Sequence, residues 1–209
     1  AGAIEEYAKA ADKQSLLSER AALRAAAYLG VFGQRINLTG DDLADFSIRL
    51  ADLAGDMASI NDTNPEDAVV AIGAAMRNEY EPMRKYGVVL NDTVLKQTIF
   101  RLTGEEVSGQ LTQQQKILAV NEELFQQLGF AIGDVERTFG TFANQERYLD
   151  AQLENLKAQL GDGLRPAFVE IVTTANQFVG ALRSIPAPVV EVGAKVGLYS
   201  TAALGAAGA

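Results

Sequence analysis

Apolar residues that recur every three or four positions are the feature that most constrains how this chain can fold. The spacing is clearest in one stretch, where the apolar residues are Leu43, Phe46, Leu50, Leu53, Met57 and Ile60. Residues three or four apart lie on one side of an α-helix, so this stretch predicts a helix of about five turns with one buried face. No stretch of useful length shows the two-residue alternation of a half-buried strand. The sequence therefore predicts an all-α fold.

Capping signals indicate where the predicted helices begin. Ser, Thr, Asn and Asp side chains can accept a hydrogen bond from the first turn of a helix. Residues of this kind precede four predicted helices: Thr39, Asn64, Asn91 and Thr112. Pro65 suits the first helical position, and Gln115 completes a capping box with Thr112. Residues 1–140 are therefore predicted to form a compact array of short and medium helices, which starts with helices over 2–13 and 15–33.

The helix that begins after Asn64 is expected to carry one apolar face as far as the turn at Glu81–Gly87. The residues on that face are Val69, Ile72, Met76, Tyr80 and Met83. Gly87 suits the left-handed conformation in which many helices end. Arg77, Glu81 and Lys85 are four residues apart, which allows ion pairs along the exposed side of one continuous helix.

A long helix is predicted over residues 141–185, starting near Ala143 and running to about Leu182. Its apolar stripe consists of Leu149, Leu153, Leu156, Leu160, Leu164, Phe168 and Ile171. At 1.5 Å per residue, about 40 residues span roughly 60 Å, with a bend near Pro166, which cannot donate a backbone hydrogen bond. A helix of this length usually needs a neighbour, so the stripe is a candidate oligomer seam.

The last predicted segment, residues 186–209, is an apolar helix rich in alanine and glycine. About 21 residues follow Pro188, which approaches the length needed to cross the hydrocarbon layer of a membrane. The mild hydrophobicity of this stretch favours instead a helix that packs against protein, and both interpretations stay open. The pattern is unfinished at Ala209, so we expect the helix to continue in a longer parent chain.

Composition argues against several classes of chemistry. The 209 residues contain no His and no Cys, which removes disulfides, zinc–thiolate sites, thiol nucleophiles and a Ser-His-Asp triad. A net charge of −9 disfavours specific binding of nucleic acid, which needs clustered Lys and Arg. The sequence therefore predicts a protein without enzymatic activity, metal or cofactor.

Clustered acids are assigned to helix starts and to the solvated surface. Two clusters precede or open helices: Asp41, Asp42 and Asp45, and Asn61, Asp62, Asn64 and Asp67. Neither has the spacing of a calcium loop, and acids are favoured at helix N-termini. The adjacent pairs Glu105–Glu106 and Glu122–Glu123 point about 100° apart on a helix, so each is expected to be solvated. No pair of acids is identified as buried.

The turn at Glu81–Gly87 is the most distinctive local motif. It reads Glu81, Pro82, Met83, Arg84, Lys85, Tyr86 and Gly87. We expect its charges on a solvated face above an apolar underside of Tyr80, Met83 and Tyr86, because exposed ion pairs contribute only about 0–1 kcal/mol. The alternative is that the exposed side contacts a partner protein.

Several motifs, taken in order, resemble the phage tail tape measure protein family. The helix Leu53–Asn61 and its restart at Asn64–Ala68 are similar to a helix of the family that ends at Asn and restarts at Pro-Glu-acid-Ala. The Glu81–Gly87 turn follows at the expected distance. Further similar landmarks are Leu111–Lys116, Ala143–Leu149 and Glu154–Gly161. The resemblance covers roughly residues 29–166 of the chain. Tape measure proteins are usually much longer, so this chain would be one helical region of one.

The resemblance implies a structural virion component that sets tail length. Tape measure proteins fill the lumen of a growing tail as long helices, a few copies side by side, while tube subunits and tail assembly chaperones act around them. They contact tail-tip proteins, leave ahead of the DNA, and are thought to help the genome cross the host membrane. For this chain the resemblance implies a trimer or other small homo-oligomer, contacts with tube, tip and chaperone proteins, and membrane contact through residues 186–209. It also implies a location in the tail lumen or tip, after assembly in the host cytoplasm.

A helical protein-interaction adaptor is the alternative. We find no repeat of about 33 to 47 residues, which weighs against a solenoid of this kind. Some tape measure proteins also carry wall-degrading domains, but the absence of His and Cys disfavours an enzyme here.

Overall fold

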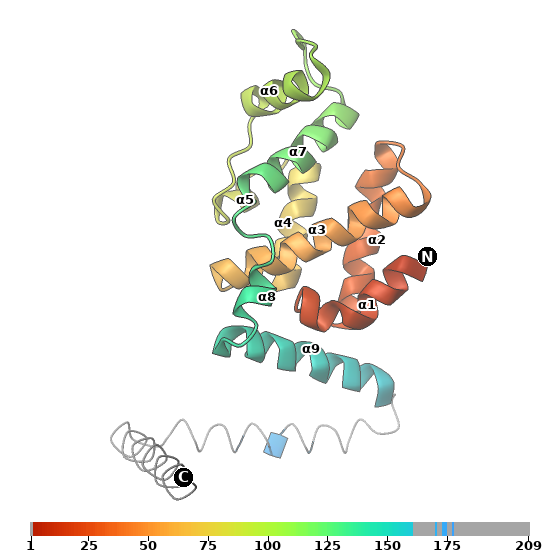
Figure 1. Ribbon diagram of the computed structural model, residues 1–209, viewed down its shortest axis with the longest axis vertical. Helices are drawn as coiled ribbons and strands as arrows, with labels where there is room; N and C mark the ends of the chain where they lie inside the picture. Colours follow the sequence, from red (N-terminus) through yellow and green to blue (C-terminus); the bar gives the residue numbers. More distant parts are fainter. Residues whose placement is uncertain (1, 161–169, 171–172, 175–176, 178–209) are drawn as a thin grey trace, which may run out of the picture. The chain divides into compact units, whose positions relative to one another are not determined.

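The computed structural model describes residues 2–160, 170, 173, 174 and 177, and this part of the chain is helical, without strands (Figure 1). The prediction of an all-α fold is confirmed. The described helices are α1 (Gly2–Gln14), α2 (Glu19–Arg35), α3 (Gly40–Asn61), α4 (Pro65–Met76), α5 (Glu81–Arg84), α6 (Asp92–Thr103), α7 (Gln113–Gln127), α8 (Asp134–Thr138) and α9 (Phe142–Leu160). Contacts divide the chain into residues 1–156 and 157–209, so α9 begins in the first unit and ends in the second.

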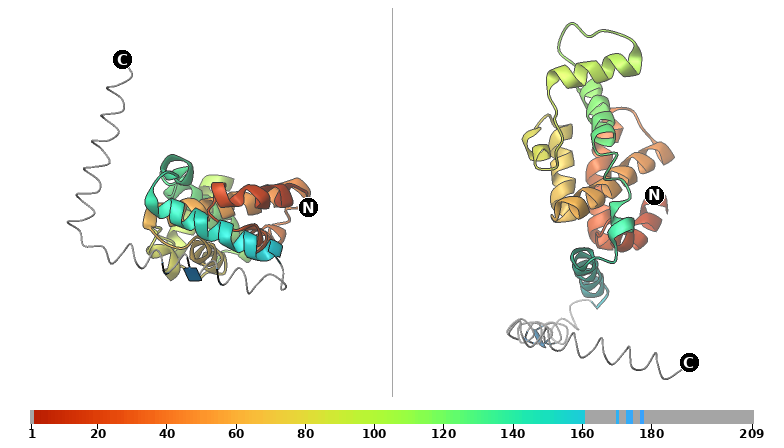
Figure 2. Two further views of the ribbon diagram at one scale, coloured as in Figure 1. Left: turned by 90° about the horizontal axis from the view of Figure 1, so that it is seen from below. Right: turned by 60° about the vertical axis from the view of Figure 1, so that its left-hand side comes forward.

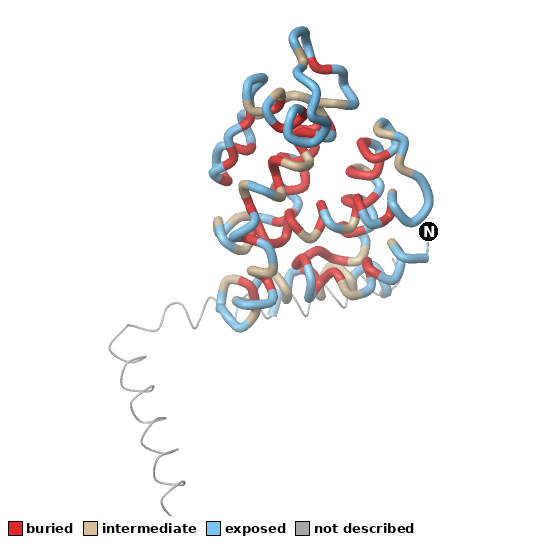
Figure 3. Tube along the Cα trace, turned by 45° about the horizontal axis from the view of Figure 1, so that its top comes forward, coloured by how far each residue is buried: buried red, intermediate tan, exposed pale blue. Residues whose placement is uncertain are grey.

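Helix α3 lies at the centre of the first unit, with α1, α2 and α4 packed around it (Figures 1 and 2). The predicted stripe supplies the contact, because Leu50, Leu53 and Met57 are buried. Only its two ends depart from the prediction, since Leu43 is half-buried and Ile60 is exposed. Figure 3 shows the buried residues gathered on the facing sides of these helices. Burial of this face is the main source of helix stability in a chain of short helices.

Small residues bring α1, α2 and α3 close together. Ala22, Ala25 and Ala26 on α2 are buried, as expected from the alanine-rich stretch. On α3, Gly55 lies against the backbone of Ser15 in the turn between α1 and α2, where an added Cβ would stand 2.5 Å from the Ser15 Cα. The absence of a side chain at Gly55 therefore permits this contact between backbones.

Helix α2 begins later than predicted, at Glu19 rather than residue 15. Leu16 adopts a left-handed conformation with φ of 58°, and Ser18 then caps α2 by accepting a hydrogen bond from Ala21 N–H at 3.2 Å. A left-handed residue ends the helical path, so the chain turns before α2.

Three of the four predicted caps form hydrogen bonds. Asn64 Oδ1 accepts from Glu66 N–H at 2.7 Å, and Asn91 Oδ1 accepts from Val94 N–H at 3.0 Å. The capping box is complete, because Thr112 and Gln115 each bond the other's backbone N–H. Thr39 occupies the cap position of α3 without a side-chain hydrogen bond. Local sequence thus predicts where these helices start.

The helix that follows Asn64 is shorter than predicted. Helix α4 ends at Met76, and Asn78 adopts a left-handed conformation with φ of 73°. Glu79 N–H then donates back to Ala74 O at 2.9 Å, which closes the helix end. Tyr80 and Met83 therefore lie beyond a turn. Asn tolerates the left-handed region, so the chain can turn here without a glycine.

Helix α9 begins at Phe142, one residue before the predicted start at Ala143. Apart from residues 170, 173, 174 and 177, the predicted continuation to Leu182 lies outside the described residues, as do the bend near Pro166 and the apolar helix over 186–209. Within the described part of the chain, none of the helices combines the length and the hydropathy that a membrane span requires.

Candidate functional site

The turn at Glu81–Gly87 is divided between the core and the surface. Met83 and Tyr86 are buried in the main hydrophobic cluster, whereas Glu81, Arg84 and Lys85 are exposed. Pro82 is exposed in the first turn of the short helix α5, and Gly87 has the left-handed φ of 78° expected of it. The motif therefore anchors α5 through two side chains and leaves its charges free to meet solvent or a partner.

The predicted ladder of Arg77, Glu81 and Lys85 does not form. Arg77 Nε pairs with Glu79 at 3.2 Å, and Arg84 Nε pairs with Glu81 at 3.1 Å. The ladder requires one continuous helix, and the turn at Asn78 removes that geometry. Both pairs are exposed, so each contributes at most about 1 kcal/mol.

The described part of the candidate oligomer seam is partly exposed on α9. Phe142, Leu149 and Leu156 have exposed fractions of 84%, 57% and 41%, respectively. Leu153 and Leu160 are half-buried. The remaining predicted seam residues, Leu164, Phe168 and Ile171, lie outside the described residues. A row of large apolar side chains on the solvent side of a helix is the expected appearance of an interface without its partner.

The inner side of α9 is polar, and the only buried residues on this helix are Asn144 and Ala151. Asn144 Nδ2 donates to Ser59 Oγ at 2.7 Å, and Arg147 Nε donates to Thr63 O at 3.0 Å. Further along, Asn155 Oδ1 accepts from Glu19 N–H at 2.8 Å. Helix α9 thus forms hydrogen bonds to the other helices on one side and exposes Leu149 and Leu156 on the other.

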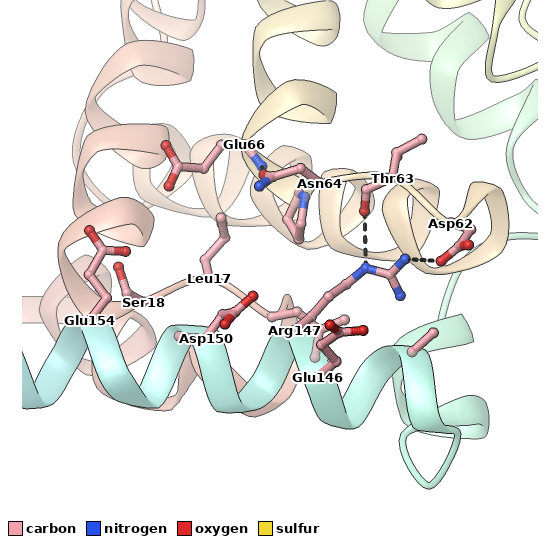
Figure 4. Close-up of a pocket in the computed structure, with 14 residues that line it drawn as sticks. Leu17, Ser18, Asp62, Thr63, Asn64, Glu66, Glu146, Arg147, Asp150 and Glu154 are labelled. Atoms are coloured by element: carbon pink, nitrogen blue, oxygen red, sulfur yellow. Dashed lines mark hydrogen bonds and ion pairs between the residues drawn. The ribbon is translucent and has the colours of Figure 1, made fainter. Parts of the chain in front are cut away.

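A groove of about 300 Å³ runs between α9, the turn before α2 and the turn between α3 and α4 (Figure 4). Its acidic side chains are Asp62, Glu66, Glu146, Asp150 and Glu154, and its cationic one is Arg147. Figure 4 shows Arg147 reaching across to Asp62 and Thr63. Beside the groove, Arg24 Nη2 lies 3.8 Å from Glu66 and 4.0 Å from Glu154. Arginines of the chain itself therefore balance part of this acidic charge.

The structure reveals a pair of neighbouring acids, one buried and one half-buried, that the sequence did not identify. Asp52 and Asp56 are four residues apart on α3, and both line a cavity of about 690 Å³ beside α8. Burial is the main reason that the pKa of Asp52 is raised to about 6. A hydrogen bond from the Tyr7 hydroxyl lowers this pKa, and the nearby charge of Asp56 raises it. Burial also raises the pKa of Asp56, and its hydrogen bonds to Val135 and Gly133 oppose that shift. Asp52 directly precedes Leu53, and Asp56 directly precedes Met57, and both of these apolar residues belong to the buried stripe. This position beside the stripe is the sequence signal that could have indicated burial of the two acids.

Asp56 has a structural role, because its carboxylate holds the start of α8. Its Oδ2 accepts from Gly133 N–H at 2.7 Å and its Oδ1 accepts from Val135 N–H at 3.0 Å. The carboxylate thus caps the start of α8 from a distant part of the chain. Asp52 Oδ1 is buried without a hydrogen-bond partner among the described residues. The Tyr7 hydroxyl shares a hydrogen bond of 2.8 Å with Ser15 Oγ.

The prediction that the pair Glu122–Glu123 is solvated is wrong for Glu123. Glu123 is buried between α6 and α7, although Glu105 and Glu106 are exposed as expected. Its carboxylate accepts hydrogen bonds from Thr98, from Arg101 at 2.9 Å and from Gln127 at 2.7 Å. Burial opposes ionisation, but these hydrogen bonds together lower the pKa of Glu123. Thr98 and Arg101 reach Glu123 only because α6 packs against α7, so the spacing of residues along α7 alone could not predict this environment.

Acids of both clusters lie at helix starts as predicted, and Asp62 is an exception. Asp41 and Asp42 lie in the first turn of α3, and Asn64 caps α4. Asp62 ends α3 in a left-handed conformation. Among the described residues, no group of three or more acids is arranged to hold a metal ion.

Comparisons of the chain with family models, with curated proteins and with solved structures give no match. The outer face of α9, the Glu81–Gly87 turn and the acids around α8 and α9 are therefore the features on which a functional proposal can rest.

Proposed function

We propose that this chain is a helical region of a phage tail tape measure protein, a structural virion component that sets tail length. It would sit in the tail tube or tip lumen, contact tube, tip and chaperone proteins, and assist passage of the genome through the host membrane. The ordered motifs from Leu53 to Gly161 support this proposal, as does the all-α fold. The observation that carries it is the outward apolar face of α9, which suits a helix that bundles with copies of itself.

The finer architecture belongs to the same proposal. We propose that the stripe of α9 continues through Leu164, Phe168 and Ile171 in a long helix bent near Pro166, followed by the apolar segment 186–209. In that arrangement the leucines of α9 would form the first part of a seam shared by a trimer or another small homo-oligomer. Such a seam buries apolar area that a single chain leaves in water.

Replacing both Leu153 and Leu160 with Asp is expected to abolish self-association. Each change places a charge in the seam, where pairing would have to remove it from water. Light scattering with size-exclusion chromatography should give a mass of about three chains for the unmodified protein and one chain for the variant. Circular dichroism and the melting temperature must show that the variant remains helical.

Ala158→Asp is the matched control, because Ala158 is exposed and lies on the opposite side of α9 from Leu160. It adds a charge to the same helix and should leave the mass unchanged. Equal masses for the unmodified protein and the seam variant would contradict the proposed seam. A monomer that instead binds a helical peptide through this face would favour the adaptor function.

The virion assignment has its own test. Tryptic peptides of this chain should be found by mass spectrometry in purified particles of the phage that encodes it. A low-resolution reconstruction should then show helical density inside the tail tube or tip. Particles that contain the tail but lack these peptides would contradict the assignment, whatever the mass in solution.

A further inference from the structure

A series of polar contacts attaches the segment that includes α8 and α9 to α3 and its neighbours. Asp56 bonds the backbone at the start of α8, and Ser59 Oγ donates to Asp134 Oδ2 at 2.6 Å. Asn144 and Arg147 then bond Ser59 and Thr63. These bonds exchange readily with water, so each contributes far less than buried apolar area of similar extent.

Few side chains of this segment are fully buried. On α8 and α9 the buried residues are Val135, Asn144 and Ala151, whereas Leu149 and Leu156 are exposed and Leu153 and Leu160 are half-buried. By contrast, α3 buries Leu50, Leu53 and Met57 against its neighbours. Elements with few buried apolar contacts open at a lower free-energy cost than the core of the same protein.

Two cavities lie along this contact. The groove of about 300 Å³ lies beneath α9, and the cavity of about 690 Å³ is bounded by α8 on one side and by Lys13, Asp52 and Asp56 on the other. Both are large compared with the roughly 30 Å³ that one water occupies in the liquid. Water can therefore reach polar groups on both sides of the contact, which favours exchange of its hydrogen bonds.

The chain also supplies a place where such a segment could pivot. Leu128 is buried at the end of α7, and the next described helix begins at Asp134. In the turn between them, Ala131 is buried in the core and fixes one end of the pivot, whereas Phe130 and Ile132 are exposed and Gly133 has a left-handed φ of 78°. Glycine at this position allows the backbone to change direction with little steric restriction.

We propose that residues 134–160 form a releasable arm that detaches as a unit from α1–α4, pivoting in the turn at residues 129–133. The docked arm covers the polar side of the body, and the released arm presents α9 as a helix of roughly 29 Å with every side accessible. This inference goes beyond the proposed function, because release is a property of a single chain and requires no second copy.

Amide hydrogen exchange of the unmodified protein tests the proposal directly. The slowest amides of α9 should exchange at least about tenfold faster than the slowest amides of α3, and should share one opening free energy. Amides of α3 buried with Leu53 should report unfolding of the whole body. Protection of α9 equal to that of α3 would overturn the proposal.

A disulfide clamp provides the matched test, since the chain contains no natural cysteine. Ser59→Cys combined with Asn144→Cys puts thiols on two neighbouring side chains that now share a hydrogen bond from Asn144 Nδ2 to Ser59 Oγ at 2.7 Å. Oxidation should slow exchange in α9 at least about tenfold relative to the reduced form of the same variant, without changing exchange in α6. Unchanged exchange in α9 after oxidation would overturn the proposal.

Asn144→Ala removes one attachment without a cross-link and keeps the proposal testable if the disulfide does not form. Exchange in α9 should accelerate while exchange in α3 stays constant, because only docking is weakened. Acceleration in both helices alike would mean that α9 opens only with the body, which contradicts a separate arm. The monomeric seam variant Leu153→Asp/Leu160→Asp separates the two proposals, since arm release should persist in it even though self-association is lost.

Discussion

Gly55→Ala is expected to lower the free energy of unfolding by about 3 kcal/mol. An added Cβ would stand 2.5 Å from Ser15 Cα and 2.6 Å from Ser15 O, well inside contact distance. Ser15 cannot easily move away, because its hydroxyl bonds Ala11 O and Tyr7, and the next residue, Leu16, has a left-handed φ. Overpacking of a core usually costs about 1–3 kcal/mol, and a clash with backbone belongs at the upper end.

Urea denaturation followed by circular dichroism measures this effect as a lower midpoint at constant slope. Gly109→Ala is the control, since a Cβ there would meet nothing within 4 Å. We expect that control to change stability by no more than about 0.5 kcal/mol. A Gly55→Ala protein with the midpoint of the unmodified chain would show that the α1–α2 turn does not pack on α3 as described.

Asp52→Asn is expected to stabilise the protein by about 2 kcal/mol at pH 7. The pKa of Asp52 is about 6 in the folded protein, against its ordinary value of 3.8. The folded state therefore binds a proton more tightly than the unfolded state. Between about pH 4 and pH 6 this group lowers stability as pH rises, and the loss is complete above the folded pKa. A gap of this size corresponds to about 3 kcal/mol, and we expect about 2 because Asp52 is only partly buried.

The measurement is the difference in unfolding free energy between the Asn variant and the unmodified protein from pH 4 to pH 8. Asn resembles the protonated acid in shape and lacks the charge, so the difference should be small at pH 4 and grow up to about pH 6. The other ionisable side chains around Asp52 are Tyr7, Lys13, Asp56 and Glu136. Taking the difference between the two proteins removes most of their effect.

Asp150→Asn serves as the control for charge removal at an exposed acid on α9. Its stability should stay within about 0.5 kcal/mol of the unmodified protein at every pH. An Asp52→Asn difference that does not vary with pH would contradict a raised pKa. A variant that is destabilised at pH 7 would mean that the charged carboxylate makes a contact essential to the fold.

Charge burial shows the clearest limit of prediction from the sequence. Glu123 and Asp56 lie on amphipathic helices where spacing alone does not show which neighbour will cover them. Glu123 is covered because α6 brings Thr98 and Arg101 to it. Asp56 is covered because α8 returns to it from 77 residues further along the chain. In both cases the partner that satisfies the acid comes from another helix, and its position follows only from the tertiary fold.

Local interactions explain what the sequence by itself determined: the all-α fold, the buried stripe of α3, and the caps at Asn64, Asn91 and Thr112. These depend on residues within about four positions of one another, whose side chains meet in any helix. The side of α9 that meets the rest of the protein was decided by tertiary structure alone. An apolar stripe predicts that some surface will cover it, but contacts with residues far away in the chain place polar side chains of α9 against α3 and leave Leu149 and Leu156 exposed.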